Sequence, residues 1–160
     1  RDSSLSPERF REVKARQSES LIRESLSKER GTLMRMNQIS VFIENKEGNL
    51  LTVSKILKDN NIDIRTLSLA DTSEYGMLRM IVSDEELAKK VLKEAGFPVS
   101  ITPVIAVRTN NKVGFMHDLL AKIPAEVANI EYMYTLPSDE GSILIIKVAD
   151  LDRVEQALGD

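Results

Sequence analysis

Hydrophobic and polar residues alternate along several short stretches of the chain, and each of these stretches predicts a β-strand. Residues 38–44, QISVFIE, place an apolar side chain at every second position, and residues 62–72 and 77–83 follow the same rule. Between the first two stretches, residues 47–61 change to the three- and four-residue spacing that is typical of an amphipathic helix. A second helix is predicted at 84–96, where acidic residues come first, lysines follow and a glycine ends the pattern.

The order of these elements predicts a known α+β arrangement. A fourth strand at 97–102 completes the order β-α-β-β-α-β, the ferredoxin-like split unit, which places two helices on one face of a four-stranded antiparallel sheet. The rest of the chain repeats the order almost without a linker. The expected elements of this second series are strands at 103–109, 127–136 and 142–148 and helices at 114–123 and 150–160.

The two series are copies of one unit. The phrase Asn-Lys-x-Gly occurs at 45–48 and again at 111–114, 66 positions later, and sliding the whole chain by 66 aligns the apolar positions without a gap. Chance does not keep one register through so many apolar positions, so the sequence predicts two tandem units with the same fold. The aligned pairs include Ile39/Ile105, Val41/Val107, Leu78/Leu144, Val82/Val148 and Leu92/Leu158.

The second copy lacks the counterpart of the last strand of the first. Asp160 aligns with Glu94, so nothing aligns with residues 95–102. In a ferredoxin-like sheet that strand pairs with strand one of its own unit, and without it the backbone donors and acceptors of one edge lose their partners. Either the sequence is cut short, or another segment or subunit fills the gap; we favour truncation.

Residues 1–35 differ from the rest of the chain and predict a helical or disordered extension. Ser6-Pro7-Glu8 is a favourable helix start. The segment is either a docking helix for a partner or an extension that packs loosely or belongs to an upstream fusion. We favour the extension, because Met36 begins what reads as a complete domain. The predicted division is an extension at 1–35, a first unit at 36–102 and a second unit at 103–160. A thin apolar stripe runs along the extension through Phe10, Val13, Leu21, Ile22 and Leu26.

Composition and charge exclude several classes of function. The 160 residues include no cysteine and one histidine, so disulfides, thiolate metal sites and a cysteine nucleophile are excluded and a metal site is not expected. Residues 1–35 carry a net charge of +3 and the remaining residues −6, which argues against a nucleic-acid footprint on the body of the chain. No apolar run reaches the length of about 20 residues that spans a membrane. We expect a cytoplasmic location, no cofactor and no catalytic residues, because no acid-base or nucleophilic cluster is evident.

The Asn-Lys-x-Gly phrases mark the two points where a strand turns sharply into a helix. The first turn of a helix has free N–H groups, and these donors together with the helix dipole favour a carboxylate. Glycine allows positive φ and a close approach of a ligand to the backbone, which Gly48 and Gly114 would provide. The alternative is that both glycines serve only as tight turns.

The βαββαβ unit with glycine at this turn resembles the ACT domain, a small regulatory module that binds amino acids. The family phrase is Asp-x-Pro-Gly followed by an apolar residue; here it reads NKEGNL at 45–50 and NKVGFM at 111–116, with Glu47 and Val113 in place of proline. The resemblance implies that an amino acid lies between this loop and strand two of a neighbouring ACT unit. The expected ligand-binding residues are Asn45, Gly48, Asn49, Leu50, Leu69, Ala70, Asn111, Gly114, Phe115, Met116, Tyr132 and Tyr134.

Two functional interpretations follow from this resemblance. In the first, the chain is a non-enzymatic regulatory protein that binds a small molecule, an amino acid, at interfaces between ACT units, forms a homodimer and acts on itself or on an enzyme partner. In the second, it is a regulatory or interaction subunit that binds a protein rather than a metabolite. Tyr132 and Tyr134 alternate along one strand face, where they would line a ligand, form a subunit interface or cover the helices.

Overall fold

The computed structural model describes residues 6, 8, 9, 13, 16, 33–44, 46–71, 74–127, 129–139 and 141–159. The chain divides into two compact units, residues 1–30 and residues 31–160. The helix that the sequence predicts within residues 1–35 falls almost entirely outside the described residues and stays a prediction. No helix in the described ranges is both long and apolar enough to cross a membrane.

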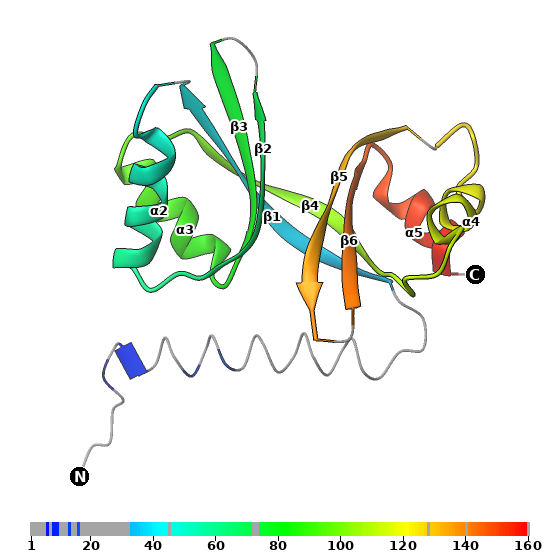
Figure 1. The fold of residues 1–160 in the computed structure, drawn as a ribbon. Helices are drawn as coiled ribbons and strands as arrows, with labels where there is room; N and C mark the ends of the chain where they lie inside the picture. The colour runs from blue at the N-terminus through cyan, green and yellow to red at the C-terminus, as the bar shows by residue number, and fades with distance from the viewer. Residues whose placement is uncertain are drawn as a thin grey trace. The chain divides into compact units, whose positions relative to one another are not determined.

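Residues 31–160 form α+β structure, as the sequence predicts (Figure 1). The elements follow in the order β1 (Leu33–Glu44), α2 (Asn49–Asp59), β2 (Ile64–Asp71), β3 (Tyr75–Val82), α3 (Glu85–Glu94), β4 (Val99–Arg108), α4 (Phe115–Ala121), β5 (Ile130–Ser138), β6 (Gly141–Val148) and α5 (Leu151–Gly159).

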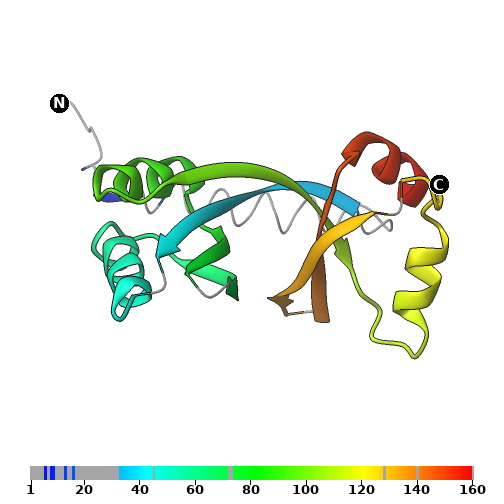
Figure 2. The same cartoon turned by 90° about the horizontal axis from the view of Figure 1, so that it is seen from above.

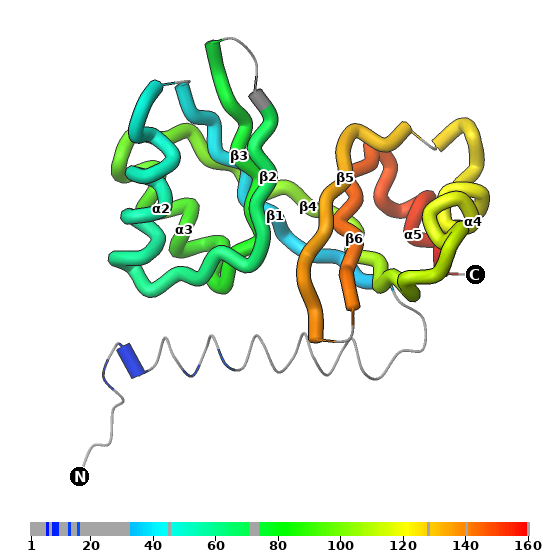
Figure 3. The backbone as a smooth tube through the Cα atoms, viewed as in Figure 1, coloured from blue at the N-terminus to red at the C-terminus, as the bar shows by residue number. Residues whose placement is uncertain are grey.

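The strands form one six-stranded sheet in the order β2-β3-β1-β4-β6-β5, and neighbouring strands are antiparallel. The first half of the repeat contributes β2, β3, α2 and α3, and the second half contributes β5, β6, α4 and α5. Strands β1 and β4 lie at the centre and join the two halves, as the chain trace shows (Figure 3). Both halves therefore have the ferredoxin-like order that the sequence predicts, but they share a single sheet.

Strand β4 corrects one expectation. The sequence predicts two separate strands at 97–102 and 103–109, whereas the structure has the single strand Val99–Arg108. Pro103 lies in its middle and pairs with Asn37 of β1. A proline without N–H is tolerated here because β6 pairs with β4 only from Ile105 onward, so the other side of the strand is open at Pro103. The last strand of the first half and the first strand of the second half are thus one element.

Strand β1, like β4, belongs to both halves of the sheet. It begins at Leu33, three residues before the boundary that the sequence predicts, and its register with β4 runs from Leu33 opposite Val107 to Val41 opposite Val99. Residues 33–38 therefore pair with the first strand of the second half, in the position that the sequence analysis left without a partner. Another segment of the same chain fills the gap, and Figure 2 shows this long β1–β4 pair linking the halves.

Each half has its own core between the sheet and its two helices. The equivalent residues of the repeat are buried in both cores, which is what the apolar register of 66 predicts. The pairs buried on both sides are Ile39/Ile105, Val41/Val107, Val53/Leu119, Leu57/Ile123, Leu78/Leu144, Met80/Ile146, Val82/Val148 and Ala88/Val154.

The opposite face of the sheet carries no helix and is also partly buried. Strand residues alternate between the two faces, and several that point away from the helices are less than 10% exposed, including Ile81, Val104, Ala106, Ile143 and Ile145. The two edge strands β2 and β5 are in contact, and the Thr66 hydroxyl donates a hydrogen bond of 2.7 Å to the Thr135 carbonyl. The helix-free faces of the two halves therefore pack toward each other.

Candidate functional site

The two strand-to-helix corners have the same backbone conformation. Gly48 precedes α2 with φ 83° and ψ −8°, and Gly114 precedes α4 with φ 86° and ψ −6°. These angles lie in the left-handed region, which glycine adopts without the steric penalty of a Cβ atom. No side chain caps either helix, so the first-turn N–H groups of both have no side-chain acceptor at the cap position.

The other two helices begin differently. Asp84 accepts a hydrogen bond of 3.0 Å from the Leu87 amide at the start of α3. Its counterpart Asp150 accepts one of 3.1 Å from the Arg153 amide at the start of α5. In each half, therefore, the second helix has an aspartate cap and the first helix has an open N-terminus. Helix α2 has 11 residues, whereas α4 has seven and presents a shorter dipole.

The predicted asparagines help to build the corners. The Asn49 side chain donates through Nδ2 to the Glu44 carbonyl at 2.8 Å, which ties α2 to the end of β1. Asn111 has φ 54° and accepts a hydrogen bond of 3.1 Å from the Thr109 hydroxyl through its Oδ1 atom. Asn45 lies outside the described residues. The asparagines thus order the turns, and the Oδ1 atom of Asn49 has no hydrogen-bond donor among the described residues.

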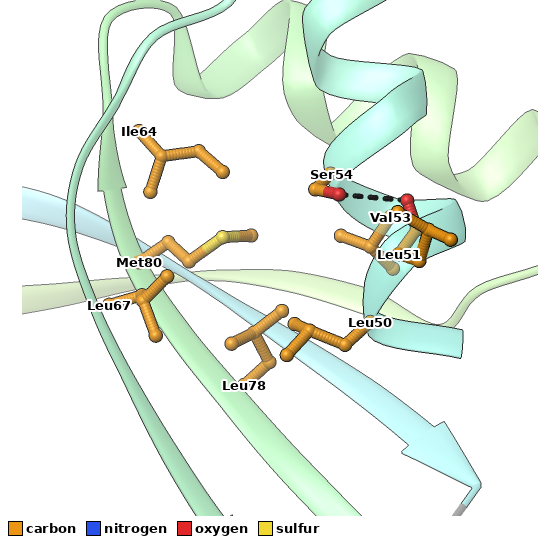
Figure 4. Close-up of a pocket in the computed structure, with 8 residues that line it drawn as sticks. All are labelled: Leu50, Leu51, Val53, Ser54, Ile64, Leu67, Leu78 and Met80. Carbon is orange, nitrogen blue, oxygen red and sulfur yellow. Dashed lines mark hydrogen bonds between the residues drawn. The ribbon is translucent and has the colours of Figure 1, made fainter. Parts of the chain in front are cut away.

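An apolar cavity of about 410 Å³ opens between α2 and the strands β2 and β3 of the first half (Figure 4). Its volume lies in the range of small-molecule pockets. Ser54 is the one polar residue of the lining, and its hydroxyl donates to the Leu51 carbonyl at 2.8 Å. The lining consists of Leu50, Leu51, Val53, Ser54, Ile64, Leu67, Leu78 and Met80.

The structure brings some of the predicted residues to this cavity and places others elsewhere. Leu50 lines it, two residues after Gly48. Leu69 lies opposite Leu78, on the helix-covered face, and is 46% exposed. Ala70 lies on the other face of β2, because neighbouring strand residues alternate. In the second half, Phe115 packs against the core and Met116 is exposed.

Tyr132 and Tyr134 lie on the helix-free face, away from both corners. The Tyr134 hydroxyl donates to Gln38 Oε1 at 2.6 Å, and Gln38 Nε2 donates to the Tyr132 hydroxyl at 2.8 Å. Gln38 also donates to the Ser40 hydroxyl at 2.9 Å and is fully buried. Burial raises the pKa of Tyr134 above its ordinary value, with a smaller rise from Tyr132. The two tyrosines therefore join β5 of the second half to β1.

Arg79 and Gln38 are notable polar residues that the sequence reasoning did not single out. The guanidinium carbon of Arg79 lies 3.7 Å from the centre of the Tyr132 ring, a cation–π contact. Arg79 and Gln38 both occupy polar positions of alternating strands, on the face opposite the helix-covered core, so alternation alone gives no signal for either. The tyrosine partners of Gln38, 94 and 96 residues away, are not detectable in the sequence either, because they depend on the packing of β5 over β1.

Comparison with known proteins identifies the family. A family model described as an ACT domain pair matches residues 34–158. A crystal structure of protein BT0572 from Bacteroides thetaiotaomicron is similar to the chain, with 34% identity and a TM-score of 0.71, and the alignment covers 79% of this chain and 88% of that one. None of the curated proteins matches the chain.

The fold is also shared with more distant structures. The regulatory subunit of aspartate kinase from Thermus thermophilus aligns at 14% identity and a TM-score of 0.55, covering 79% of this chain and 94% of that one. The corresponding subunit from Thermus flavus aligns at 15% identity and a TM-score of 0.53, with the same coverage. The repeat, the shared sheet, the glycine corners and the matched family model agree, and the chain belongs to the ACT domain pair family.

Proposed function

We propose that this chain is a non-catalytic regulatory protein that binds an amino acid with an apolar side chain in the cavity of the first half. The observation that carries the proposal is the position of this cavity beside the open N-terminus of α2. Leu50 and Leu51 belong both to the first turn of α2 and to the cavity lining. An apolar volume and backbone donors for a carboxylate therefore meet at one place.

The ligand would be held by the two kinds of group that an aliphatic amino acid requires. The first-turn N–H groups of α2 and the positive end of its dipole bind the carboxylate. Gly48 has no atom within 4 Å of the place where a Cβ would lie, so the backbone is open to a close approach there. Asn49 Oδ1 accepts from the ammonium, and Leu67, Leu78 and Met80 enclose the side chain.

We extend the proposal to an interface between copies. By resemblance to ACT domains, strand β2 or β5 of a neighbouring copy covers each corner in a homodimer, with Leu69, Ala70, Tyr132 and Tyr134 on the covering strands. The hydroxyls of both tyrosines are engaged by Gln38 within the chain, so their rings supply the contact. Ligand binding at this interface would change the association of the protein with itself or with an enzyme. The sequence also predicted ligand contacts at the equivalent corner of the second half, through Asn111, Gly114, Phe115 and Met116. There Phe115 packs against the core and α4 is shorter than α2, so the proposal assigns the amino acid to the first half only.

The test is binding of the twenty amino acids, measured by thermal shift and then by calorimetry. Leucine, isoleucine, valine and methionine are expected to raise Tm at millimolar concentration, and aspartate and lysine are not. Leu50→Asp places a charge in the cavity and should abolish the shift. The matched control is Met116→Asp at the equivalent, exposed position of the repeat, which should leave it intact. The absence of stabilisation by any apolar amino acid would overturn the proposal.

A second candidate function is the binding of a protein partner, such as an enzyme, through the same region. Leu51 and Leu67 of the cavity lining are 73% and 47% exposed, and Leu69, two residues after Leu67 on the same face of β2, is 46% exposed. Exposed apolar patches of this kind mark interaction surfaces. Leu51→Asp would then abolish partner capture and leave amino-acid binding unchanged, whereas the first proposal predicts a loss of amino-acid binding. Removing residues 1–32, which leaves β1 whole, tests whether the N-terminal segment is a docking element.

A further inference from the structure

Four polar residues form a row across the helix-free face of the first half. Ser68 of β2 lies opposite Arg79 of β3, Arg79 lies opposite Ser40 of β1, and Ser40 lies opposite Ser100 of β4. Residues opposite each other in neighbouring strands point to the same face. We call these four residues the polar row. The Thr102 hydroxyl adds a fifth polar group, 3.3 Å from that of Ser40.

The second half shows that the fold does not require this polarity. The positions aligned with Ser68, Arg79 and Ser40 are Tyr134, Ile145 and Ala106, and Met34 of β1 takes the place of Ser100 in the sheet. These four residues also lie opposite one another across β5, β6, β4 and β1. Ile145 is fully buried and Ala106 is 1% exposed. The equivalent strands in the same pairing thus support a row with no serine and no charged residue, so sheet formation does not explain the serines and the arginine.

Arg79 is the charged member of the row, and its environment favours an anion. It is half-buried, and among the residues that the structure describes no carboxylate lies within ion-pair distance of it. Its guanidinium lies against the Tyr132 ring, a contact that leaves the N–H donors at the edge of the guanidinium plane free. A half-buried cation without a counter-charge is costly, and an oxyanion would relieve that cost.

The neighbouring groups are also donors rather than acids. Ser40, Ser68 and Thr102 are half-buried, so their hydroxyls can reach a bound group. Lys147 lies opposite Tyr132 on the same face and adds a second basic residue there, and its ammonium donates to the Val148 carbonyl at 3.1 Å. No cluster of histidine and acidic side chains that could hold a metal ion occurs in the described ranges.

We propose that the polar row binds the oxyanion group of a small molecule, a carboxylate or a phosphate. Arg79 supplies two parallel N–H donors, the Ser40 and Ser68 hydroxyls supply further hydrogen bonds, and Tyr132 forms the wall that holds the guanidinium in place. This site lies on the face of β1, β2 and β3 opposite the apolar cavity. It contains a charge partner for an anion, which the cavity lining lacks. The proposal therefore does not depend on amino-acid binding at α2.

The experiment is a titration of the full chain with inorganic phosphate and, separately, with acetate at constant ionic strength, with chloride as the blank. The readouts are the guanidinium and amide NMR signals of Arg79 and the apparent Kd. Saturable binding by either anion, with shifts at Arg79, Ser40 and Ser68, is expected. The anion with the lower apparent Kd identifies the class of oxyanion, phosphate or carboxylate.

Variants separate specific binding from general screening by salt. Arg79→Met should lower the affinity for the anion at least about tenfold, because it removes a charge-assisted hydrogen-bonded pair. Arg79→Lys should bind the anion more tightly than Arg79→Met and less tightly than the unchanged protein. Ser40→Ala, which preserves the charge and the Tyr132 contact, should weaken binding several-fold. The control is Lys58→Met, an exposed cation on α2, which should change nothing. Unsaturable shifts, or equal affinity in Arg79→Met, Ser40→Ala and Lys58→Met, would overturn the proposal.

Discussion

The two halves of this protein are alike on the helix-covered face of the sheet and different on its helix-free face. Eight aligned pairs are buried in both cores, from Ile39 and Ile105 to Ala88 and Val154. On the helix-free face, however, the polar row of the first half corresponds to a row with no serine and no charged residue in the second. The difference shows which strand positions the fold needs, because within the sheet the helix-covered positions keep their apolar character in both copies and the compared positions of the helix-free face do not.

The regions around the two corners differ in the same way. Asn49, whose side chain bonds to the backbone of β1, corresponds to Phe115, which packs into the second core. Ser54 of the cavity lining corresponds to Leu120, and the apolar Leu51 corresponds to His117. One backbone geometry therefore carries two different sets of side chains. This is why we assign the apolar ligand to the first half only.

The largest expected effect comes from the strand that the two halves share. A chain that begins at Leu33 should fold with both halves intact, whereas a chain that begins at Ile39 removes the pairing of β1 with residues 102–107. The second half should then lose several kcal/mol of stability, because the edge of its first strand has unpaired backbone groups and Leu33 leaves its core. Hydrogen exchange at Leu144 and Ile146 measures this loss, with Leu78 and Met80 as the internal reference.

Equal protection of the second half in both truncated chains would contradict this role for β1. A loss of protection in both halves together would instead show that they unfold as one cooperative unit.

The pairing of β1 with β4 also shows which part of the fold the sequence does not predict. Alternation and helical spacing are local, so the elements and the register of 66 were predictable from the residues themselves. The pairing of Leu33 with Val107 joins residues more than 70 positions apart, and no local pattern encodes it. The boundary that the sequence predicts between the strands 97–102 and 103–109 falls at Pro103. Pro103 lies inside a strand here because one side of β4 is unpaired at that position.

The candidate site was predictable to the same limited extent. The Asn-Lys-x-Gly phrases predicted both corners, and the positive φ of Gly48 and Gly114 agrees with the requirement for glycine. The cavity was not predictable, because it depends on how far α2 lies from β2 and β3. The hydrogen bonds that join Gln38 to Tyr132 and Tyr134 were also not predictable from the sequence, because they arise from packing between the halves.

The next largest effect should come from Gln38, whose equivalent in the second half is the buried Val104. Gln38→Val makes the first half resemble the second and leaves the hydroxyls of Tyr132 and Tyr134 without their amide partner. The variant should lose about 2 kcal/mol of stability in urea denaturation, the cost of unsatisfied buried polar groups. In a double-mutant cycle, Tyr134→Phe should recover part of that loss. An unchanged midpoint would mean that the amide network makes no net contribution.

Substitutions at the helix N-termini should cause smaller losses of stability, of similar size at equivalent positions of the two halves. Asp84→Ala and Asp150→Ala each remove a cap and should cost about 1 kcal/mol in urea denaturation. Gly48→Ala and Gly114→Ala should cost a similar amount, about 1–2 kcal/mol, because alanine is disfavoured in the left-handed region. Neither glycine has an atom closer than 3.9 Å to an added Cβ, so backbone strain alone would be measured. Costs that differ strongly between equivalent positions would show that the two corners are not energetically alike.

The smallest effect concerns alkaline pH. Burial raises the pKa of Tyr134 in the folded state above its unfolded value, which lies near 10. The unfolded chain therefore loses this proton first as the pH rises, and the contribution to stability is present below about pH 10 and decreases above it. Tyr134→Phe should make the alkaline decline shallower and remove a late phase from the absorbance titration of tyrosinate. Identical alkaline profiles for the two proteins would contradict the assignment.

The central claim is that one fold, used twice, carries its amino-acid site only in the first half. The most direct measurement is amide NMR of the full chain during titration with leucine. We expect saturable shifts at Gly48, Leu50, Leu51 and Leu67, with little change at the equivalent Gly114, Met116, His117 and Met133. Shifts of equal size at both sets, or at the second set alone, would contradict it.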